Sequence, residues 1–334
     1  MKQWVSWTVD NLFRGCEPKD LVATMTAAKV EASAAQQIVV EAVALKQEQA
    51  LHKLESVVSI LASLQIEQWA AGHTSTMERV SSLSPAKFLA KYYFGSRPVI
   101  LTKLAQDWPA LKLWTPEYFA DKFGDAMIEI QSGRDQDPNY EINSPKLKRQ
   151  VRMRDFVASV LDGSAGNNQY LTANNHALKQ PALAPLLDDI GSLPDFLFDR
   201  SRLPNESLLW MGGEGVITPV HHDTMQLMHT QIVGQKRWQL VSPLQTPLMY
   251  NHIGVFSKLE FDANDEVLYP LSKQLRIIDV IVKPGETLFV PVGWWHRVES
   301  LTPSISLSYT NFAPTGVTST VPNHFTYRNP HEAD

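Results

Sequence analysis

Two histidines and one aspartate stand at positions from which they could bind a metal ion. His221 and Asp223 are separated by a single residue, and His296 follows 75 positions after His221. If residues 218–223 are extended, His221 and Asp223 point to the same face with their Cα atoms about 7 Å apart, while His222 points to the other face. Two histidines and one carboxylate on one side of an ion are typical of non-haem Fe(II) oxygenases, whose other coordination positions stay free for reactants.

The residues before His296 favour a buried site. The sequence reads G-E-T-L-F-V-P-V-G-W-W-H over residues 285–296. A strand that ends in Pro-x-Gly and is followed by two tryptophans would deliver the histidine into a dry cavity with aromatic walls. Taken alone, His-x-Asp is a weak motif, and His296 could equally be a core histidine bonded to a backbone carbonyl. Taken together, the three residues favour a metal site.

A lysine on an apolar strand face predicts a bound anion. Over residues 236–241, alternate positions place Lys236 on the same side as Trp238 and Leu240. Burying a cation is unfavourable unless an anion meets it. Because no adjacent carboxylate in the sequence supplies that anion, we expect a carboxylate of a ligand to pair with Lys236.

The elements that would hold these residues are strands. From Ser207 onward, short stretches with strand character follow one another, separated by turns that contain glycine or proline. This spacing favours an antiparallel sandwich or barrel. The clearest strand covers residues 304–312, where the amide of Asn311 shares the apolar face of the alternation.

The first part of the chain predicts a separate helical domain. Residues 30–71 are rich in Ala, Gln, Glu, Leu and Lys, which favour helices. We expect one helix to about Phe13, one from Pro18 and a long one that closes near Gly72. The predicted domain boundaries are therefore 1–72 for an N-terminal helical arm, with the catalytic domain in the rest of the chain.

That catalytic domain, residues 73–334, is predicted to begin with mixed α/β structure. Helices are expected to start at Pro85 and Pro116, each preceded by a Ser or Thr that can cap the helix. The core of the barrel is expected over about residues 165–312. The fold class is therefore mainly β with flanking helices and an N-terminal helical arm.

A seam in the arm leaves two interpretations open. Leu51, Leu54, Val58 and Leu61 follow a spacing of three and four residues. The seam could pack within a helical hairpin on its own domain, or form a short coiled coil that makes a homodimer. We favour the hairpin because two heptads fall short of the three or four that a coiled-coil prediction needs.

Composition limits the function classes. The 334 residues contain 30 Lys and Arg against 35 Asp and Glu, and a net charge of −5 gives no general attraction for nucleic acid. The single cysteine, Cys16, can form neither an internal disulfide nor a thiolate zinc site. The first residues lack a signal-peptide pattern, and no apolar run approaches the ~20 residues that cross a bilayer. We expect a cytoplasmic protein with no membrane contact.

The combined motifs resemble those of a known family. The pattern G-x5-H-x-D from Gly215 and the pattern G-x5-P-x-G-x2-H from Gly285 are similar to the two cupin motifs. With residues 234–237 and 294–296, they resemble the JmjC, cupin-like (cupin_8) Fe(II)/2-oxoglutarate-dependent dioxygenases. Within these, the resemblance is to protein hydroxylases typified by the asparaginyl hydroxylase that inhibits hypoxia-inducible factor. It covers about residues 84–312 and does not include the arm.

The resemblance implies a fold, a reaction and a set of site residues. The fold would be a double-stranded β-helix, a jelly-roll type of barrel. The reaction would use O2 to convert 2-oxoglutarate to succinate and CO2 while hydroxylating an aliphatic C–H. The substrate is unidentified, and a protein or peptide is favoured over a small molecule. The implied site residues are His221, Asp223 and His296 for Fe(II), and Lys236 with Thr218, Tyr170 and Asn311 for the cosubstrate region, Asn311 being placed near the metal.

Two positions depart from the family pattern. Relatives usually carry an asparagine five or six residues after the first ligand, where this chain has Gln226 and Leu227. Leu227 also stands where many four-ligand cupins carry a glutamate. Three protein ligands remain, which suits a dioxygenase. The orientation of 2-oxoglutarate at the metal stays open.

Other readings of the sequence also stay open. The chain could be a metal-binding cupin of another reaction class, such as an isomerase or a cosubstrate-independent dioxygenase, or a non-catalytic cupin module. The basic run 146–154 carries five cations and is either a solvated surface or a docking site for an acidic peptide or RNA. The resemblance implies a dimer through C-terminal helices, but the tail after Phe312 shows no helical period. The N-terminal arm is therefore the candidate for a homodimer contact.

Overall fold

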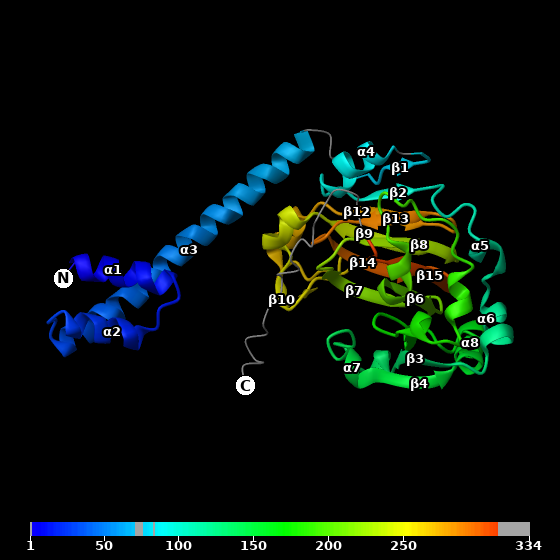
Figure 1. Cartoon of the computed structure of the whole chain (residues 1–334), viewed down its shortest axis with the longest axis horizontal. Coiled ribbons are helices and arrows are strands. Elements are labelled where there is room, and N and C mark those ends of the chain that lie inside the picture. The colour runs from blue at the N-terminus through cyan, green and yellow to red at the C-terminus, as the bar shows by residue number, and fades with distance from the viewer. Residues whose placement is uncertain (1, 71–75, 83, 313–334) are drawn as a thin grey trace. The chain divides into compact units, whose positions relative to one another are not determined.

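The computed structural model describes residues 2–70, 76–82 and 84–312 (Figure 1). Contacts divide the chain into two compact units, Met1–Gly72 and His73–Asp334. The predicted domain boundary at residues 73–76 and the tail after Phe312 fall largely outside the described residues. In the described part, no helix is long and apolar enough to span a membrane.

Three helices form the first unit: α1 (Lys2–Phe13), α2 (Pro18–Ala27) and α3 (Ala32–Ala70). Pro18 occupies the first turn of α2, where its missing N–H has no intrahelical partner to lose. Helices α1 and α2 both pack against α3. Their core contains buried apolar side chains, Val5, Val9, Leu12, Leu21, Met25, Ala35, Ile38, Val39 and Ala42. The three helices predicted from the sequence are therefore confirmed.

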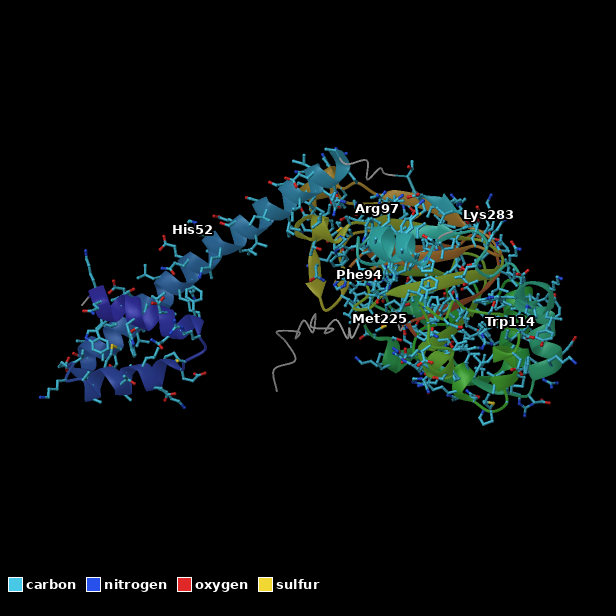
Figure 2. All side chains as sticks on the ribbon, turned by 45° about the horizontal axis from the view of Figure 1, so that its top comes forward. His52, Phe94, Arg97, Trp114, Met225 and Lys283 are labelled. Atoms are coloured by element: carbon cyan, nitrogen blue, oxygen red, sulfur yellow. The ribbon has the colours of Figure 1, made fainter. Side chains whose placement is uncertain are left out.

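The second half of α3 is not part of that core. Leu51 and Leu54 are 62% and 60% exposed, and Val58 is 38% exposed. Figure 2 shows His52 on this part of α3 with its side chain exposed. The favoured expectation, that this seam packs inside a helical hairpin, is wrong because the buried residues that α3 shares with α1 and α2 run only from Ala35 to Ala42. A homodimer through the seam stays a prediction.

Two β-sheets form the second unit (Figure 1). The nine-stranded sheet has the order β1 (Arg79–Val80), β2 (Val99–Leu101), β13 (Thr287–Val290), β8 (Leu227–Val233), β15 (Ser304–Tyr309), β6 (Ser207–Gly212), β5 (Gln169–Leu171), β3 (Met127–Ser132), β4 (Lys148–Arg152). The six-stranded sheet has the order β10 (Asn251–Ile253), β11 (Phe256–Ser257), β7 (Ile217–His222), β14 (Trp295–Ser300), β9 (Lys236–Val241), β12 (Ile278–Val282). Apart from the parallel pair β1–β2, neighbouring strands are antiparallel. The predicted mainly β, cupin-like fold is confirmed, as two facing sheets rather than one closed barrel.

Short helices accompany the nine-stranded sheet. They are α4 (Pro85–Phe88), α5 (Ala110–Leu113), α6 (Pro116–Phe123), α7 (Ser144–Leu147), α8 (Met153–Leu161) and α9 (Leu203–Glu206). The predicted caps are present, since Ser84 accepts the Lys87 N–H at 3.3 Å and Thr115 accepts the Tyr118 N–H at 3.1 Å. Phe119 of α6 and Phe156 of α8 belong to one core with residues of the sheet's outer face.

The space between the sheets has two halves. One half is filled by apolar side chains of both sheets, among them Leu240, Val280, Leu288 and Val290. The other half is a cavity of about 470 Å³. Strand β15 shows how the hollow arises. Its apolar residues face the outer core, while its serines face inward.

Candidate active site

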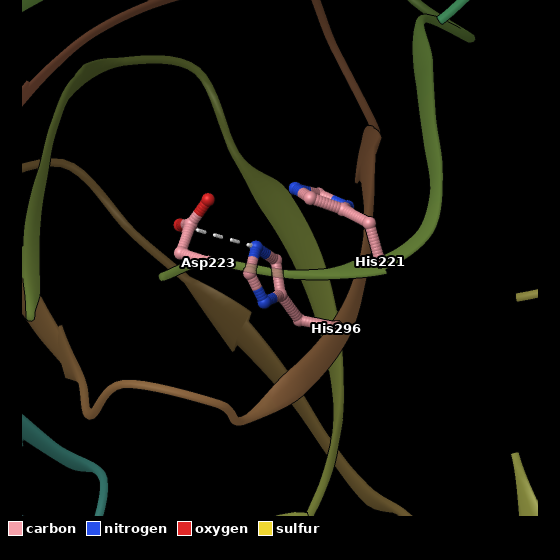
Figure 3. Close-up of side chains that lie close together, drawn as sticks. All are labelled: His221, Asp223 and His296. Carbon is pink, nitrogen blue, oxygen red and sulfur yellow. Dashed lines mark ion pairs between the residues drawn. The ribbon is translucent and has the colours of Figure 1, made fainter. Parts of the chain in front are cut away.

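The three predicted metal ligands lie close together (Figure 3), and all three line the cavity. One side-chain ligand atom from each of His221, Asp223 and His296 lies within 4.8 Å of the others. The His296 Nε2 atom is 3.8 Å from Asp223 Oδ2, and the two imidazole ring centroids are 4.2 Å apart. His296 is buried, whereas His221 and Asp223 are half-buried. Two imidazoles and one carboxylate converge from one side, which fits an Fe(II) site.

Neighbouring strands position these ligands. His221 on β7 pairs directly with His296 on β14, whereas the next pair along the ladder is Thr218 with Val298. Strand β7 therefore carries one extra residue between the two pairs, which is a β-bulge. Because of this bulge, Thr218 and His221 both line the cavity although they are three positions apart. His222 points to the other face, where its ring packs against Trp295.

Backbone carbonyls orient both histidines. His221 Nδ1 lies 2.8 Å from the Pro219 carbonyl oxygen, and His296 Nδ1 lies 2.9 Å from that of Trp294. Since a carbonyl only accepts, each Nδ1 carries the proton and each Nε2 keeps its lone pair for a metal. Burial lowers the pKa of His296 to about 4, with a further contribution from His221. The imidazole of His296 is therefore neutral at neutral pH, as metal binding requires.

Lys236 lies in the same cavity and has no carboxylate partner among the described residues. It is 1% exposed, and its Nζ donates a hydrogen bond to Tyr170 Oη at 2.9 Å. The ammonium also lies within 6 Å of the Tyr170 and Trp210 ring centroids. Burial lowers the pKa of Lys236 to about 7. A carboxylate of a ligand would restore the charged lysine, as the sequence predicted.

Tyr170 and Thr218 line the same cavity as Lys236, and their role toward a cosubstrate stays a prediction. Burial raises the pKa of Tyr170, so its hydroxyl stays protonated. Tyr170 pairs with Gly212 on the neighbouring strand, and a Cβ at Gly212 would lie 2.7 Å from the Tyr170 ring. A side chain at position 212 would therefore displace the tyrosine that bonds Lys236.

Asn311 does not line the cavity, so the prediction that it lies near the metal is wrong. Its Nδ2 donates to the Asp199 carbonyl oxygen at 2.8 Å. The inward-facing residues of this segment are instead Ser308 and Thr310. Asn311 continues the apolar face of β15. This face packs on the helices and loops outside the sheet, whereas the prediction places Asn311 on the cavity side.

The two departures from the family pattern have structural positions. Gln226 accepts the Val292 N–H at 3.0 Å through Oε1, which ties the segment after Asp223 to the loop before His296. Leu227 lines the cavity.

Sequence reasoning missed several cavity residues, among them His229 and Trp210. Both are buried or half-buried, and Trp210 donates its indole N–H to Ser308 Oγ at 2.6 Å. The signal for His229 was available, because it lies two residues after Leu227 on β8 and so shares its face.

Comparison with known proteins gives one family and several relatives. Residues 85–314, more than half of the chain, match the model of the cupin-like domain (Cupin_8). Lysine-specific demethylase JMJ30 of Arabidopsis thaliana is 29% identical over 70% of this chain and 54% of its own length. Jumonji C domain-containing protein 5 of Drosophila melanogaster is 29% identical over 67% of this chain and 56% of its own length.

Lysine-specific demethylase 8 of Xenopus tropicalis is 27% identical over 66% of this chain and 49% of its own length. The chain thus spans about half the length of the curated relatives it matches. The predicted resemblance to cupin-like JmjC proteins is confirmed, whereas a specific similarity to an asparaginyl hydroxylase is not shown.

Proposed function

The chain belongs to the cupin-like domain family, and from this premise we propose that it is an Fe(II)- and 2-oxoglutarate-dependent oxygenase that hydroxylates an aliphatic C–H. The observation that carries the proposal is the presence, in one cavity, of the cluster His221, Asp223 and His296 together with the buried Lys236. A metal site alone fits many cupins. A buried lysine beside it fits a metal-bound ligand that carries a second carboxylate.

The protein's part in the reaction is to bind and orient. His221, Asp223 and His296 would hold Fe(II), which when bound activates O2 at the expense of 2-oxoglutarate and so supplies the oxidising chemistry. The Nδ1–H groups of the two histidines stay bonded to backbone carbonyls, so the rings keep their orientation with or without the metal.

The other end of the cavity would bind the distal carboxylate of 2-oxoglutarate. Lys236 supplies the charge, Tyr170 supplies a hydroxyl hydrogen bond, and Thr218 lines the same wall. In this dry setting the charge-assisted hydrogen bond is stronger than a neutral one. Trp238 stacks on His296 at 5.4 Å between ring centroids and excludes water from one side of the metal site.

The proposed substrate is a protein or peptide. The two relatives named as lysine-specific demethylases act, by those names, on lysine. Hydroxylation of an N-methyl carbon leaves a carbinolamine that releases formaldehyde, so demethylation and stable hydroxylation are two outcomes of the same C–H chemistry. We favour stable hydroxylation, and formaldehyde release separates the two.

The test is anaerobic reconstitution of the full chain with Fe(II), followed by exposure to oxygen with and without 2-oxoglutarate. We expect succinate to form only when metal, oxygen and 2-oxoglutarate are all present. Metal binding without succinate would contradict the proposal and support a cupin of another reaction class. Partner binding that is indifferent to iron, again without succinate, would support a non-catalytic module. Mass spectrometry for products that gain one oxygen would then identify the substrate.

A further inference from the structure

The charges at the mouth of the cavity are not balanced. Two carboxylates line it away from the metal cluster, Glu141 and Glu206, and each is paired with an arginine, at 2.8 and 2.7 Å respectively. Lys179 also lines the cavity and is exposed. Within residues 2–70, 76–82 and 84–312, its side chain has no hydrogen bond or ion pair. Besides the buried Lys236, the lining therefore offers an incoming group one exposed, unpaired cation, Lys179, and no unpaired carboxylate outside the cluster.

The basic run singled out in the sequence borders the same mouth. Ser144, the first residue of α7, lines the cavity, and Lys146 on that helix is exposed. Lys148, which begins β4, donates to the carbonyl oxygen of the lining residue Ala173 at 2.8 Å. Helix α7 and strand β4 therefore lie beside the segment 172–177, so the run is part of the rim rather than a distant surface.

The segment 172–177 is held in one conformation. Asn174 and His176 have φ angles of 57° and 51°, a left-handed region that residues other than glycine adopt at a cost. The buried Asn175 between them donates to the Thr172 and Leu209 carbonyls and accepts the Ala177 N–H. This clamp keeps Asn174 and His176 exposed at the mouth, and strain of this kind often marks a binding segment.

We propose that the mouth recognises an acidic peptide segment next to the residue to be modified, with Lys146 and Lys179 meeting its carboxylates. This inference rests on the proposed function, because only an oxygenase has a residue to modify. The docking of the peptide itself needs no metal. A cationic segment would find no unpaired carboxylate among the lining residues outside the metal cluster. An acidic peptide is favoured over RNA because a net charge of −5 gives the chain no general attraction for a phosphate backbone.

The test is fluorescence anisotropy of the full chain, without metal, against labelled peptides. The probes are a glutamate-rich peptide, its glutamine counterpart, a lysine-rich peptide and a single-stranded RNA of similar length. We expect binding of the glutamate-rich peptide only, with affinity that falls several-fold between about 50 and 200 mM salt. Preferential binding of the lysine-rich peptide or of RNA would overturn the proposal.

Charge reversal identifies the surface. The double variant Lys146→Glu/Lys179→Glu should weaken binding of the glutamate-rich peptide by roughly tenfold or more. The matched control Lys112→Glu/Lys122→Glu changes two exposed lysines on α5 and α6, outside the cavity lining, and should bind like the wild type. Equal loss in both double variants would mean non-specific attraction and would overturn the assignment.

If the double variant Lys146→Glu/Lys179→Glu fails to fold, the milder variant Lys179→Ala takes its place. Its thermal unfolding transition shows whether it is folded. Its binding should fall measurably, and unchanged binding would contradict a role for Lys179. Succinate formation is measured separately on the metal-loaded wild type, so failure of the oxygenase proposal and failure of the docking proposal give different results.

Discussion

The two halves of the space between the sheets are built on opposite principles. In the packed half, Leu288 and Leu240 are fully buried and surrounded by other apolar side chains. In the hollow half, Lys236 is equally buried but meets a tyrosine hydroxyl and two aromatic rings instead of an anion. The first half stabilises the fold, because burying apolar surface is favourable. The second contains groups whose burial is unfavourable until a ligand arrives.

This difference predicts that the two halves respond differently to mutation. Substitutions in the hollow half should remove ligand binding and leave the stability of the ligand-free protein unchanged or higher. Substitutions in the packed half should lower stability and leave ligand binding by the folded molecules unchanged. The following predictions test that separation, from the largest expected effect to the smallest.

Asp223→Ala should have the largest effect. Loss of the only carboxylate in the cluster should lower 2-oxoglutarate-dependent succinate formation by about 1,000-fold or more, equivalent to at least about 4 kcal/mol. Metal affinity, measured by titration calorimetry with Mn(II), should fall in parallel. The control Glu214→Ala removes an exposed carboxylate in the turn before β7 and should keep both properties. Full activity in Asp223→Ala would rule out the metal cluster.

Leu288→Ala tests the packed half. The side chain is 0% exposed, and its truncation should lower the free energy of unfolding by about 2–5 kcal/mol. Urea unfolding of the metal-free protein measures this value. The control Leu113→Ala, at a position 44% exposed, should change stability by less than about 0.5 kcal/mol. A loss of metal affinity in folded Leu288→Ala would contradict the separation of the two halves.

Lys236→Met should raise the 2-oxoglutarate requirement by about 100-fold, because a buried charge pair loses one partner. Mn(II) affinity should stay near that of the wild type, which separates this end of the cavity from the metal end. Lys283→Met, at an exposed lysine (Figure 2), is the matched control. An unchanged 2-oxoglutarate requirement in Lys236→Met would remove the assignment of this residue.

The same lysine predicts a pH dependence of stability. Its pKa falls from 10.5 to about 7 on folding, so below pH 7 the lysine is charged in both states and the folded state bears the full cost of burial. Between pH 7 and about 10.5 the unfolded chain binds more protons, and stability should rise with pH at up to about 1.4 kcal/mol per unit. Urea unfolding of metal-free wild type and Lys236→Met should show this rise in the wild type alone. Parallel profiles would contradict it.

Tyr170→Phe should have the smallest effect. It removes one hydrogen bond to Lys236, worth about 1 kcal/mol, and should raise the 2-oxoglutarate requirement about fivefold. Tyr309→Phe is the control, because its hydroxyl bonds Thr230 on the outer face of the sheet. If both variants change the requirement equally, the effect comes from packing rather than from the bond to Lys236.

The sequence predicted the chemistry of the site better than its geometry. Four cavity residues could be identified from the sequence: His221, Asp223 and His296 by their spacing, and Lys236 by its charge on an apolar strand face. A polar group at an apolar position indicates a binding site, because its burial is unfavourable without a partner. The β-bulge that brings Thr218 and His221 to one face could not be predicted, since it depends on the pairing of β7 with β14.

Two errors show where local patterns fail. The family resemblance places Asn311 near the metal, and the alternation of its strand cannot correct this, because alternation does not tell which face points inward when both faces are buried. The seam at Leu51 and Leu54 was expected to pack, but periodicity does not tell whether a neighbouring element is long enough to reach it. Both questions are decided by tertiary contacts.

The serine face of β15 has a consequence for how the shape of the cavity can change. Ser308 and Thr310 present only small side chains to the chamber, and the backbone bonds that hold the strand point sideways to β6 and β8. Exchanging one small residue for another can therefore reshape the cavity while the strand and the His221, Asp223 and His296 cluster stay where they are. In evolution, the size of the group that the cavity admits can change at this wall without a change of fold.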